Sequence, residues 1–254
     1  MHSAKLRESR GDSGRSKFEK QMTLVGPTSL GLRERNKIDK LRRITEAARE
    51  LFIAKGFDDT TTREIAVRAG VGLGTIFVYA ENKRDLLFLI VNEELEAVAA
   101  DAEASIVRSQ SFLDNLLQVA ARHYRFFGRQ PALSRLVLRE MAFYDSGAQA
   151  GRFQKTRERL ISLFGSVVAL AVEQGSLSSQ ETTHFVGWTI FCIFQVELRR
   201  WLAEDQPNLR KGLDALARAL TLFARGLQPN ERALAVDLDV ARPGKKMGAR
   251  TKRC

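Results

Sequence analysis

Two short helical patterns separated by a glycine-containing turn place the strongest constraint on how this chain of 254 residues folds. The first, "TTREIAVRAG", begins with a capping box, because Thr61 is followed three residues later by Glu64. Ala66 is small enough to face a second helix, and Gly70 tolerates the positive φ of a tight turn. Three apolar side chains are spaced to fill the wedge between the helices: Ile65, Val71 and Ile76. The sequence therefore predicts a helix-turn-helix at about 60–80.

The second pattern, "VGLGTIFVYA", is uncharged, and we expect its outer positions to face solvent or a partner. These positions are Leu73, Gly74, Thr75 and the stretch from Phe77 to Tyr79. An outer face without acidic residues is typical of a recognition helix in the major groove of DNA. The basic helix before the motif, and Lys83 with Arg84 after it, favour this interpretation. The alternative is a helical hairpin that only packs in a core.

Helical periodicity continues through the rest of the chain, without an alternating strand pattern or an internal repeat. We therefore predict an all-α fold, in which an N-terminal three-helix helix-turn-helix DNA-binding domain is joined by a long helix, roughly 83–108, to a helical ligand-binding and dimerisation domain. The expected boundaries are a disordered basic arm at 1–33, the DNA-binding domain at 34–95, the effector-binding and dimerisation domain at 96–228, and a disordered basic tail at 229–254.

The formal net charge of +11 is concentrated near the two ends of the chain. Residues 1–43 carry 12 Lys or Arg against 5 acidic residues, and residues 242–254 carry six Lys or Arg and no acidic residue. The stretch between them has a net charge of −2. A polyanionic partner such as nucleic acid explains the basic ends, and so do solvated tails without a partner. Charge alone leaves both interpretations open.

A series of short motifs runs through residues 36–90. In chain order they are an early Ile with paired Ala, Leu-Phe, Lys-Gly-Phe, Thr-Thr, Ile-Ala, Ala-Gly-Val, Gly-Thr-Ile, an aromatic residue and Lys-x-x-Leu-Leu. Together they resemble the DNA-binding domain of TetR-type transcriptional regulators. The resemblance covers about a fifth of the chain. The remainder is similar to that family only in its helical character, its length and its final pair of amphipathic helices.

The resemblance implies an all-α homodimer that binds double-stranded operator DNA and a small-molecule effector that lowers the affinity for DNA. The residues that match DNA-contacting positions of the family are Thr62, Arg63, Leu73, Gly74, Thr75, Phe77, Tyr79 and Lys83. In the family, the first two lie at the start of the second helix and the next three lead the recognition helix. The aromatic pair lies near the DNA backbone, and the lysine clamps a phosphate.

Four residues depart from the family pattern: Gly72, Leu73, Phe77 and Ala80. The first replaces a capping residue and weakens the start of the third helix. The phenylalanine lacks the hydroxyl of the usual tyrosine, and the alanine replaces a large aromatic residue. Since the leucine offers no hydrogen bond, direct readout of bases would rest on Thr75, Arg63 and apolar contact with thymine methyl groups.

Aromatic helices in the second half of the chain are candidates for an effector pocket. The stretch "FVGWTIFCIF", residues 185–194, is apolar on all sides, so we expect it to be buried on all sides. Aromatic walls with one or two polar groups are typical of small-molecule sites, and we predict effector contacts from Tyr124, His184 and Trp188. The alternative for His184, and for His123 in an earlier aromatic helix, is that the histidine is a core residue.

The last helical segment carries a heptad seam. Apolar residues from Leu209 to Leu227 step alternately by four and three positions. We predict a homodimer through helices at about 179–203 and 208–227. The alternative is that the seam packs in the core of its own chain.

Several function classes lack support in the sequence. We expect no metal site, cofactor or enzymatic activity, because metal-ligand spacing, a phosphate-binding glycine loop, HExxH and GxSxG are all missing. Two cysteines and no long apolar run indicate a cytoplasmic protein without a membrane span. The predicted function is a sequence-specific transcriptional regulator, a ligand-responsive repressor acting on a palindromic operator. The alternatives are a non-specific basic nucleic-acid-binding protein, and a helical small-molecule-binding protein or enzyme whose hairpin only packs.

Overall fold

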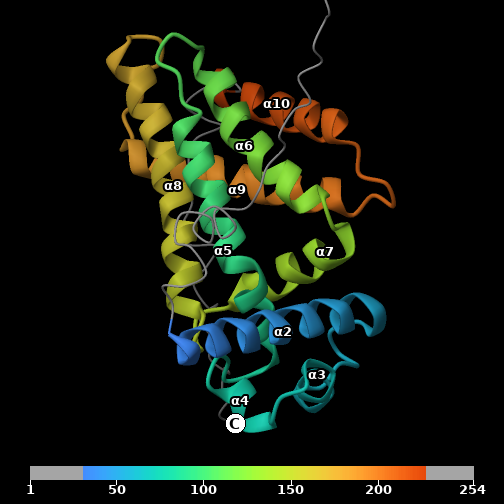
Figure 1. The fold of residues 1–254 in the computed structure, drawn as a ribbon. Coiled ribbons are helices and arrows are strands. Elements are labelled where there is room, and N and C mark those ends of the chain that lie inside the picture. The colour runs from blue at the N-terminus through green and yellow to red at the C-terminus, as the bar shows by residue number, and fades with distance from the viewer. Residues whose placement is uncertain (1–30, 227–254) are drawn as a thin grey trace, which may run out of the picture.

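A computed structural model describes residues 31–226, and this part of the chain is all helical, as predicted (Figure 1). In chain order its elements are α2 (Leu32–Lys55), α3 (Thr62–Ala69), α4 (Leu73–Phe77), α5 (Lys83–Ala104), α6 (Phe112–Gly128), α7 (Pro131–Glu140), the 3₁₀ helix η1 (Met141–Phe143), α8 (Ala150–Glu173), α9 (Thr183–Leu202) and α10 (Leu209–Arg225). The predicted tail and most of the predicted arm lie outside the described residues. The arm was predicted to extend to residue 33, whereas α2 already begins at Leu32.

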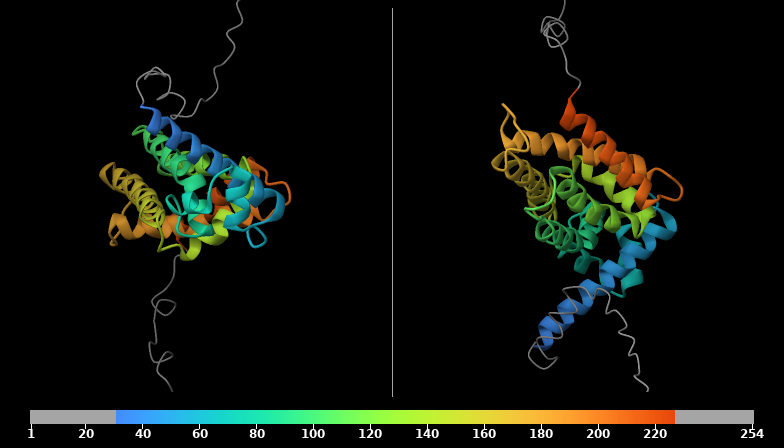
Figure 2. Two further views of the ribbon diagram at one scale, coloured as in Figure 1. Left: turned by 60° about the horizontal axis from the view of Figure 1, so that its bottom comes forward. Right: turned by 90° about the horizontal axis from the view of Figure 1, so that it is seen from above.

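Helices α2, α3 and α4 form a small unit at one end of the molecule (Figure 1). Its core contains Ile44 and Phe52 from α2, together with Ile65 and Ile76 from the two predicted helices of the motif. The third predicted wedge residue, Val71, is half-buried against the same core. The first turns of α2 project beyond the other helices (Figure 2).

The two ends of α3 have the predicted geometry. The Thr61 hydroxyl accepts a hydrogen bond from the backbone N–H of Glu64, and the Glu64 carboxylate accepts one from the backbone N–H of Thr61. Gly70 ends the helix with φ 62° and ψ 40°, which is the left-handed region. The helix-turn-helix prediction is therefore confirmed.

Helix α5 joins this unit to the larger domain, where it lies against α6 and α8 (Figure 1). It was predicted to reach residue 108 but ends at Ala104. Ser105 caps it, with the hydroxyl donating to the carbonyl of Ala102 at 2.6 Å. The following loop is then fixed by Asn115, whose amide exchanges two hydrogen bonds with the backbone of Val107.

The larger domain consists of α6 to α10 packed around an aromatic core. Tyr124 of α6 stacks on Trp201 of α9, with ring centroids 4.8 Å apart. Phe194 of α9 contacts both Tyr124 and Phe164 of α8. Because these rings come from three helices, they fix the positions of α6, α8 and α9 relative to one another.

Helix α9 differs from its prediction at its start and along one face. It begins at Thr183 and not near residue 179, because the Ser179 hydroxyl bonds the backbone of Glu181 in a turn. Thr182 caps the helix instead. The apolar stretch was expected to be buried on all sides, but one face is exposed in the single chain. Its exposed large side chains are Phe185, Trp188 and Val196.

The heptad seam in α10 packs within its own chain. Leu216 and Leu220, in the middle of the seam, are fully buried, and α10 lies against α6 and α9. The prediction that this seam forms the dimer contact is therefore wrong for these two leucines. Spacing by four and three defines an apolar face of a helix, but it does not say whether that face meets its own chain or a partner.

Candidate DNA-binding surface

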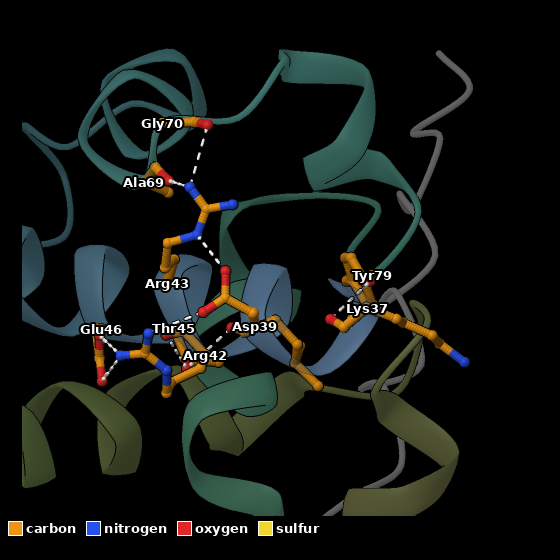
Figure 3. A network of polar contacts seen from close by, with 10 residues as sticks. Lys37, Asp39, Arg42, Arg43, Thr45, Glu46, Ala69, Gly70 and Tyr79 are labelled. Atoms are coloured by element: carbon orange, nitrogen blue, oxygen red, sulfur yellow. Dashed lines mark hydrogen bonds and ion pairs between the residues drawn. The ribbon is translucent and has the colours of Figure 1, made fainter. Parts of the chain in front are cut away.

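The turn of the helix-turn-helix is held in place by an arginine from α2 (Figure 3). Arg43 donates from Nη1 to the carbonyl oxygens of Ala69, at 3.0 Å, and Gly70, at 3.3 Å. Its Nε forms an ion pair with Asp39 at 3.0 Å. The last carbonyls of a helix have no partner within the helix, so this guanidinium satisfies groups that the turn leaves free. It thereby fixes α4 relative to α2.

Asp39 is shared between two arginines of α2. Besides Arg43, it accepts a hydrogen bond from Arg42 at 2.9 Å, and Arg42 also pairs with Glu46 (Figure 3). The hydrogen bond from Arg42 lowers the pKa of the Asp39 carboxyl below its usual value. The separate ion pair with Arg43 orients that side chain toward the turn.

The role of Arg43 was not predicted from the sequence. The available signal was its position directly before Ile44, on the inner side of an amphipathic helix that precedes a helix-turn-helix. A basic residue at such a position suggests a carbonyl partner, but the sequence does not reveal which carbonyl.

The outer face of α4 is uncharged and partly apolar. Phe77 is 51% exposed and Val78, which follows the helix, is 75% exposed. Gly74 is exposed, while Leu73 and Thr75 are half-buried. As predicted from Gly72, no side chain caps the start of α4, and the helix is only five residues long. This face offers one hydroxyl and several apolar groups to a partner.

Helix α3, which packs against α4, carries the predicted basic contact at its start. Thr62 is the first residue of the helix and is half-buried, and Arg63 is exposed. The N-terminal N–H groups of a helix carry partial positive charge, which favours a phosphate. The two predicted residues at this position are thus accessible to DNA.

Lys83 and Tyr79 are engaged within the chain. The Lys83 ammonium donates to the carbonyls of Phe57 and Asp58 and lies 4.5 Å from the centre of the Phe57 ring. It ties the start of α5 to the loop after α2, and one of its three donors remains for a phosphate. The Tyr79 hydroxyl lies 3.5 Å from the carbonyl of Lys37 in α2 (Figure 3).

The structure does not bring the three predicted effector residues together. Tyr124 is buried in the aromatic core, whereas His184 is exposed and Trp188 is 44% exposed on the outer face of α9. The Tyr124 hydroxyl has no hydrogen-bond partner although it is buried. The second histidine considered, His123, is a buried core residue whose Nδ1 lies 3.0 Å from the carbonyl of Val119.

A shallow, open hollow of about 450 Å³ lies at the start of α10, lined among others by Leu209, Arg210 and Leu213. A cavity of about 50 Å³ lies where α2, α5, α6 and α7 meet, lined among others by Arg49, Val91 and Phe127. Within residues 31–226 no group of three His, Cys, Asp or Glu side chains is placed to hold a metal ion. The helices of this part of the chain are too short or too polar to cross a bilayer.

Comparisons with known proteins agree with this geometry. Residues 44–90 match the model of the family described as bacterial regulatory proteins, tetR family. The transcriptional repressor KstR of Mycolicibacterium smegmatis is 25% identical over 184 residues, which cover 72% of this chain and 87% of that protein.

Two solved structures share the fold over most of their length. Thermus thermophilus FadR, a TetR-family transcriptional repressor in complex with lauroyl-CoA, has a TM-score of 0.57 at 24% identity, covering 81% of this chain and 100% of that one. Bacillus subtilis FadR in complex with stearoyl-CoA has a TM-score of 0.59 at 20% identity, covering 74% and 99%.

The pinned turn, the uncharged recognition face and the second all-α domain define a helix-turn-helix DNA-binding protein. The family match identifies the kind of DNA-binding domain. Residues 44–90 form a DNA-binding domain of the tetR family, and most of the chain is similar to a transcriptional repressor with such a domain.

Proposed function

We propose that the protein is a ligand-responsive repressor that acts in the cytoplasm as a homodimer on a palindromic DNA operator. The observation that carries this proposal is the left-handed turn at Gly70, pinned by Arg43, which presents an uncharged α4 beside the start of α3. The proposed DNA contacts are those predicted from the sequence: Thr62, Arg63, Leu73, Gly74, Thr75, Phe77, Tyr79 and Lys83.

The contacts divide by chemistry. Arg63 and Lys83 carry positive charge and suit phosphates, which position the protein on the duplex. Thr75 offers a hydroxyl to a base edge, while Phe77 and Leu73 offer apolar surface to thymine methyl groups. One helix of five residues reads few bases, so a symmetric pair of such helices is needed for a specific site.

The exposed face of α9 supports the dimer. Phe185 and Trp188 stack with ring centroids 6.1 Å apart, and Val196 continues the same face two turns further on. Such an apolar face on an otherwise buried helix suits a second protein surface. A second copy of the chain is the occupant that also supplies the second recognition helix. Helix α10 would contribute its exposed end, including Leu222.

The effector we propose is a coenzyme A thioester of a fatty acid. Two structures of similar fold hold lauroyl-CoA and stearoyl-CoA, and the core between α6, α8 and α9 is rich in aromatic rings. The buried Tyr124 hydroxyl lacks a partner and would donate to a polar atom of the ligand. The rings of Tyr124, Phe164 and Phe194 pack against one another in this core, so an acyl chain would enter it only if the helices moved apart.

This requirement links effector binding to DNA release. A ligand shifts an equilibrium only if it binds the two states unequally. An acyl chain that fits only a widened core would favour that state, and α5, which touches both domains, would carry the change to α4. The two recognition helices of the dimer would then no longer match the spacing of their half-sites.

The first test is selection of DNA from a random duplex pool with the purified protein at near-physiological salt. We expect a palindromic sequence. Thr75→Ala should then lower the affinity for that operator about tenfold and change the ranking of base variants. The matched control is Thr156→Ala in α8, which should leave both unchanged. A Thr75→Ala protein that ranks variants as the native protein does would show that α4 is not the reading helix.

A second test separates the proposed regulator from a non-specific nucleic-acid binder. Truncation to residues 31–226 removes the basic ends and leaves the described domains. A specific regulator keeps its order of preference among operator variants after truncation. An architectural binder loses nearly all binding, because its affinity comes from charge.

The effector is tested with lauroyl-CoA as the probe and free coenzyme A as the control. We expect lauroyl-CoA to weaken operator binding and coenzyme A to leave it unchanged. Tyr124→Phe should raise the lauroyl-CoA concentration needed for half-release by about tenfold, because the hydroxyl is lost while the ring remains. No effect of lauroyl-CoA on operator affinity would exclude this thioester as the effector.

A further inference from the structure

A loop of the larger domain closes over the first turn of α5. Residues 144–149, here called the latch loop, connect η1 to α8. Asp85, the third residue of α5, is fully buried beneath the loop. Its carboxylate accepts hydrogen bonds from the backbone N–H of Ala148 at 2.9 Å, from that of Gln149 at 3.4 Å and from the Tyr144 hydroxyl.

A fourth donor comes from the other side. The backbone N–H of Glu81, in the short link between α4 and α5, donates to Asp85 at 2.9 Å. Within the described part of the chain Asp85 forms no ion pair, so neutral donors alone stabilise its charge. A buried carboxylate is costly unless it is hydrogen-bonded. The arrangement is therefore stable only while the latch loop and the α4–α5 link remain together.

The loop is shaped to fit this carboxylate. Gly147 has φ 119°, and a Cβ at this position would lie 2.3 Å from Oδ1 of Asp85. The ring of Tyr144 stacks on Phe88 of α5, with centroids 3.9 Å apart and planes within 5°. The contact between the latch loop and α5 therefore depends on both residues, because a side chain at Gly147 or the loss of the Tyr144 ring would separate the loop from the helix.

The same loop reaches the end of the recognition helix. The Gln149 side chain donates from Nε2 to the carbonyl of Tyr79, two residues after α4 ends, at 3.2 Å. Asn92, buried in α5, donates to the backbone carbonyl of Gln149 at 3.2 Å and holds that residue in place. The latch loop therefore forms hydrogen bonds to Tyr79, shortly after α4, and to Asp85, in the first turn of α5.

We propose that the latch loop positions the recognition helix, and that Asp85 and Tyr144 are positioning residues for operator binding. The inference rests on the proposed DNA-binding function of α4. The loop leads directly into α8, which borders the aromatic core, so a displacement of the first turn of α8 pulls on the donors to Asp85. The geometry thus makes operator affinity depend on contacts about 60 residues away in the chain.

The test compares three single-group variants in the full-length protein. Tyr144→Phe removes the hydroxyl that bonds Asp85 and keeps the ring stack. Gln149→Ala removes the bond to Tyr79 and serves as a second variant if the first fails to fold. The matched control is Ser166→Ala in α8, which also deletes one hydroxyl, but one that bonds only the carbonyl of Leu163 in its own helix.

The readout is the ratio of affinities for the selected operator and for a scrambled duplex. Loss of folded protein lowers both affinities equally and cancels in the ratio, so a merely structural role would not change it. We expect the ratio to fall about tenfold in Tyr144→Phe and Gln149→Ala, by loss of one or two hydrogen bonds that hold α4 in register. It should stay unchanged in Ser166→Ala.

Amide hydrogen exchange provides an independent measurement. In Tyr144→Phe the N–H groups of Glu81 and Ala148 should exchange faster, while those of α9 should not change. Unchanged ratios together with unchanged exchange would overturn the inference while leaving the proposed function intact. A native protein that binds operator and scrambled duplex equally would overturn the proposed function itself, and with it this role of the latch loop.

Discussion

Gly187 of α9 lies directly against Gly165 of α8, so that the two helices touch backbone to backbone. A Cβ built on Gly187 would lie 2.5 Å from the nitrogen of Gly165 and 3.1 Å from the carbonyl oxygen of Ile161. This close approach fixes the rotation of α9 about its axis. It turns Trp188 and the rest of the apolar face outward, where the proposed dimer contact lies.

Gly187→Ala should therefore destabilise the fold and disturb the dimer. The added methyl group meets backbone and not a flexible side chain, so the helices must separate, at a cost of about 1–3 kcal/mol. Urea denaturation at a fixed protein concentration measures this loss. Gly151→Ala in α8 is the matched control, since nothing lies within 4 Å of a Cβ at that position. Equal stability of the two variants would contradict the close approach.

Arg43→Met should loosen the turn of the helix-turn-helix. The variant keeps an apolar stem but leaves the carbonyls of Ala69 and Gly70 without their charged donor, which should cost about 1–2 kcal/mol. Operator affinity should fall about tenfold, because α4 loses its fixed position. The control is Arg42→Met, which breaks only exposed ion pairs with Asp39 and Glu46. If both variants bound the operator equally well, the pinning role of Arg43 would be wrong.

Stability should decrease as the pH falls from 7 to 5, through His123. Burial lowers the pKa of this histidine to about 4, against the weaker opposite effect of its hydrogen bond to Val119. Between its ordinary pKa of 6.5 and 4, the unfolded chain takes up a proton that the native chain does not. The free energy of unfolding is therefore unaffected by His123 well above pH 6.5 and falls as the pH decreases toward 4. The loss amounts to about 2 kcal/mol at pH 5.

His123→Gln should remove most of this dependence. Denaturant titrations at pH 7 and pH 5 give the change in the free energy of unfolding for each protein. His184 is exposed, and His184→Gln serves as the control that keeps the native dependence. The assignment fails if His123→Gln loses as much stability between the two pH values as the native protein.

Trp188→Glu should separate the proposed dimer. A carboxylate in the middle of an apolar contact meets its symmetry mate or loses its water, and either effect is unfavourable. Sedimentation velocity should show a monomer, and operator binding should weaken at least tenfold because one recognition helix replaces two. Lys155→Glu, at an exposed position of α8, should remain dimeric. A dimeric Trp188→Glu protein with native operator affinity would place the contact elsewhere.

Features set by neighbouring residues could be predicted from the sequence. The capping box of Thr61 and Glu64 and the turn at Gly70 depend on contacts within four residues, and both were predicted correctly. The start of α9 was predicted near residue 179, whereas Thr182 caps the helix. Only the three-dimensional structure shows that Ser179 bonds its own turn.

Features that depend on distant residues could not be predicted. The surroundings of Asp85 are one example, because its partners Tyr144 and Ala148 lie about 60 residues later in the chain. The seam in α10 had the right period, but Leu216 faces its own chain. The candidate effector residues share an aromatic composition, yet the turn of α9 places Trp188 outside and Phe194 inside.

The apolar recognition face has a consequence for chemically modified DNA. Phe77 and Val78 have exposed hydrocarbon side chains, so at the proposed DNA contact they would respond to a methyl group on a pyrimidine and not to the identity of the base. The methyl group of 5-methylcytosine occupies the same ring position as that of thymine. At any operator position read by these two side chains, methylation of a cytosine therefore reproduces part of the signal of a thymine. The protein would then respond to an epigenetic mark through the same surface with which it reads sequence.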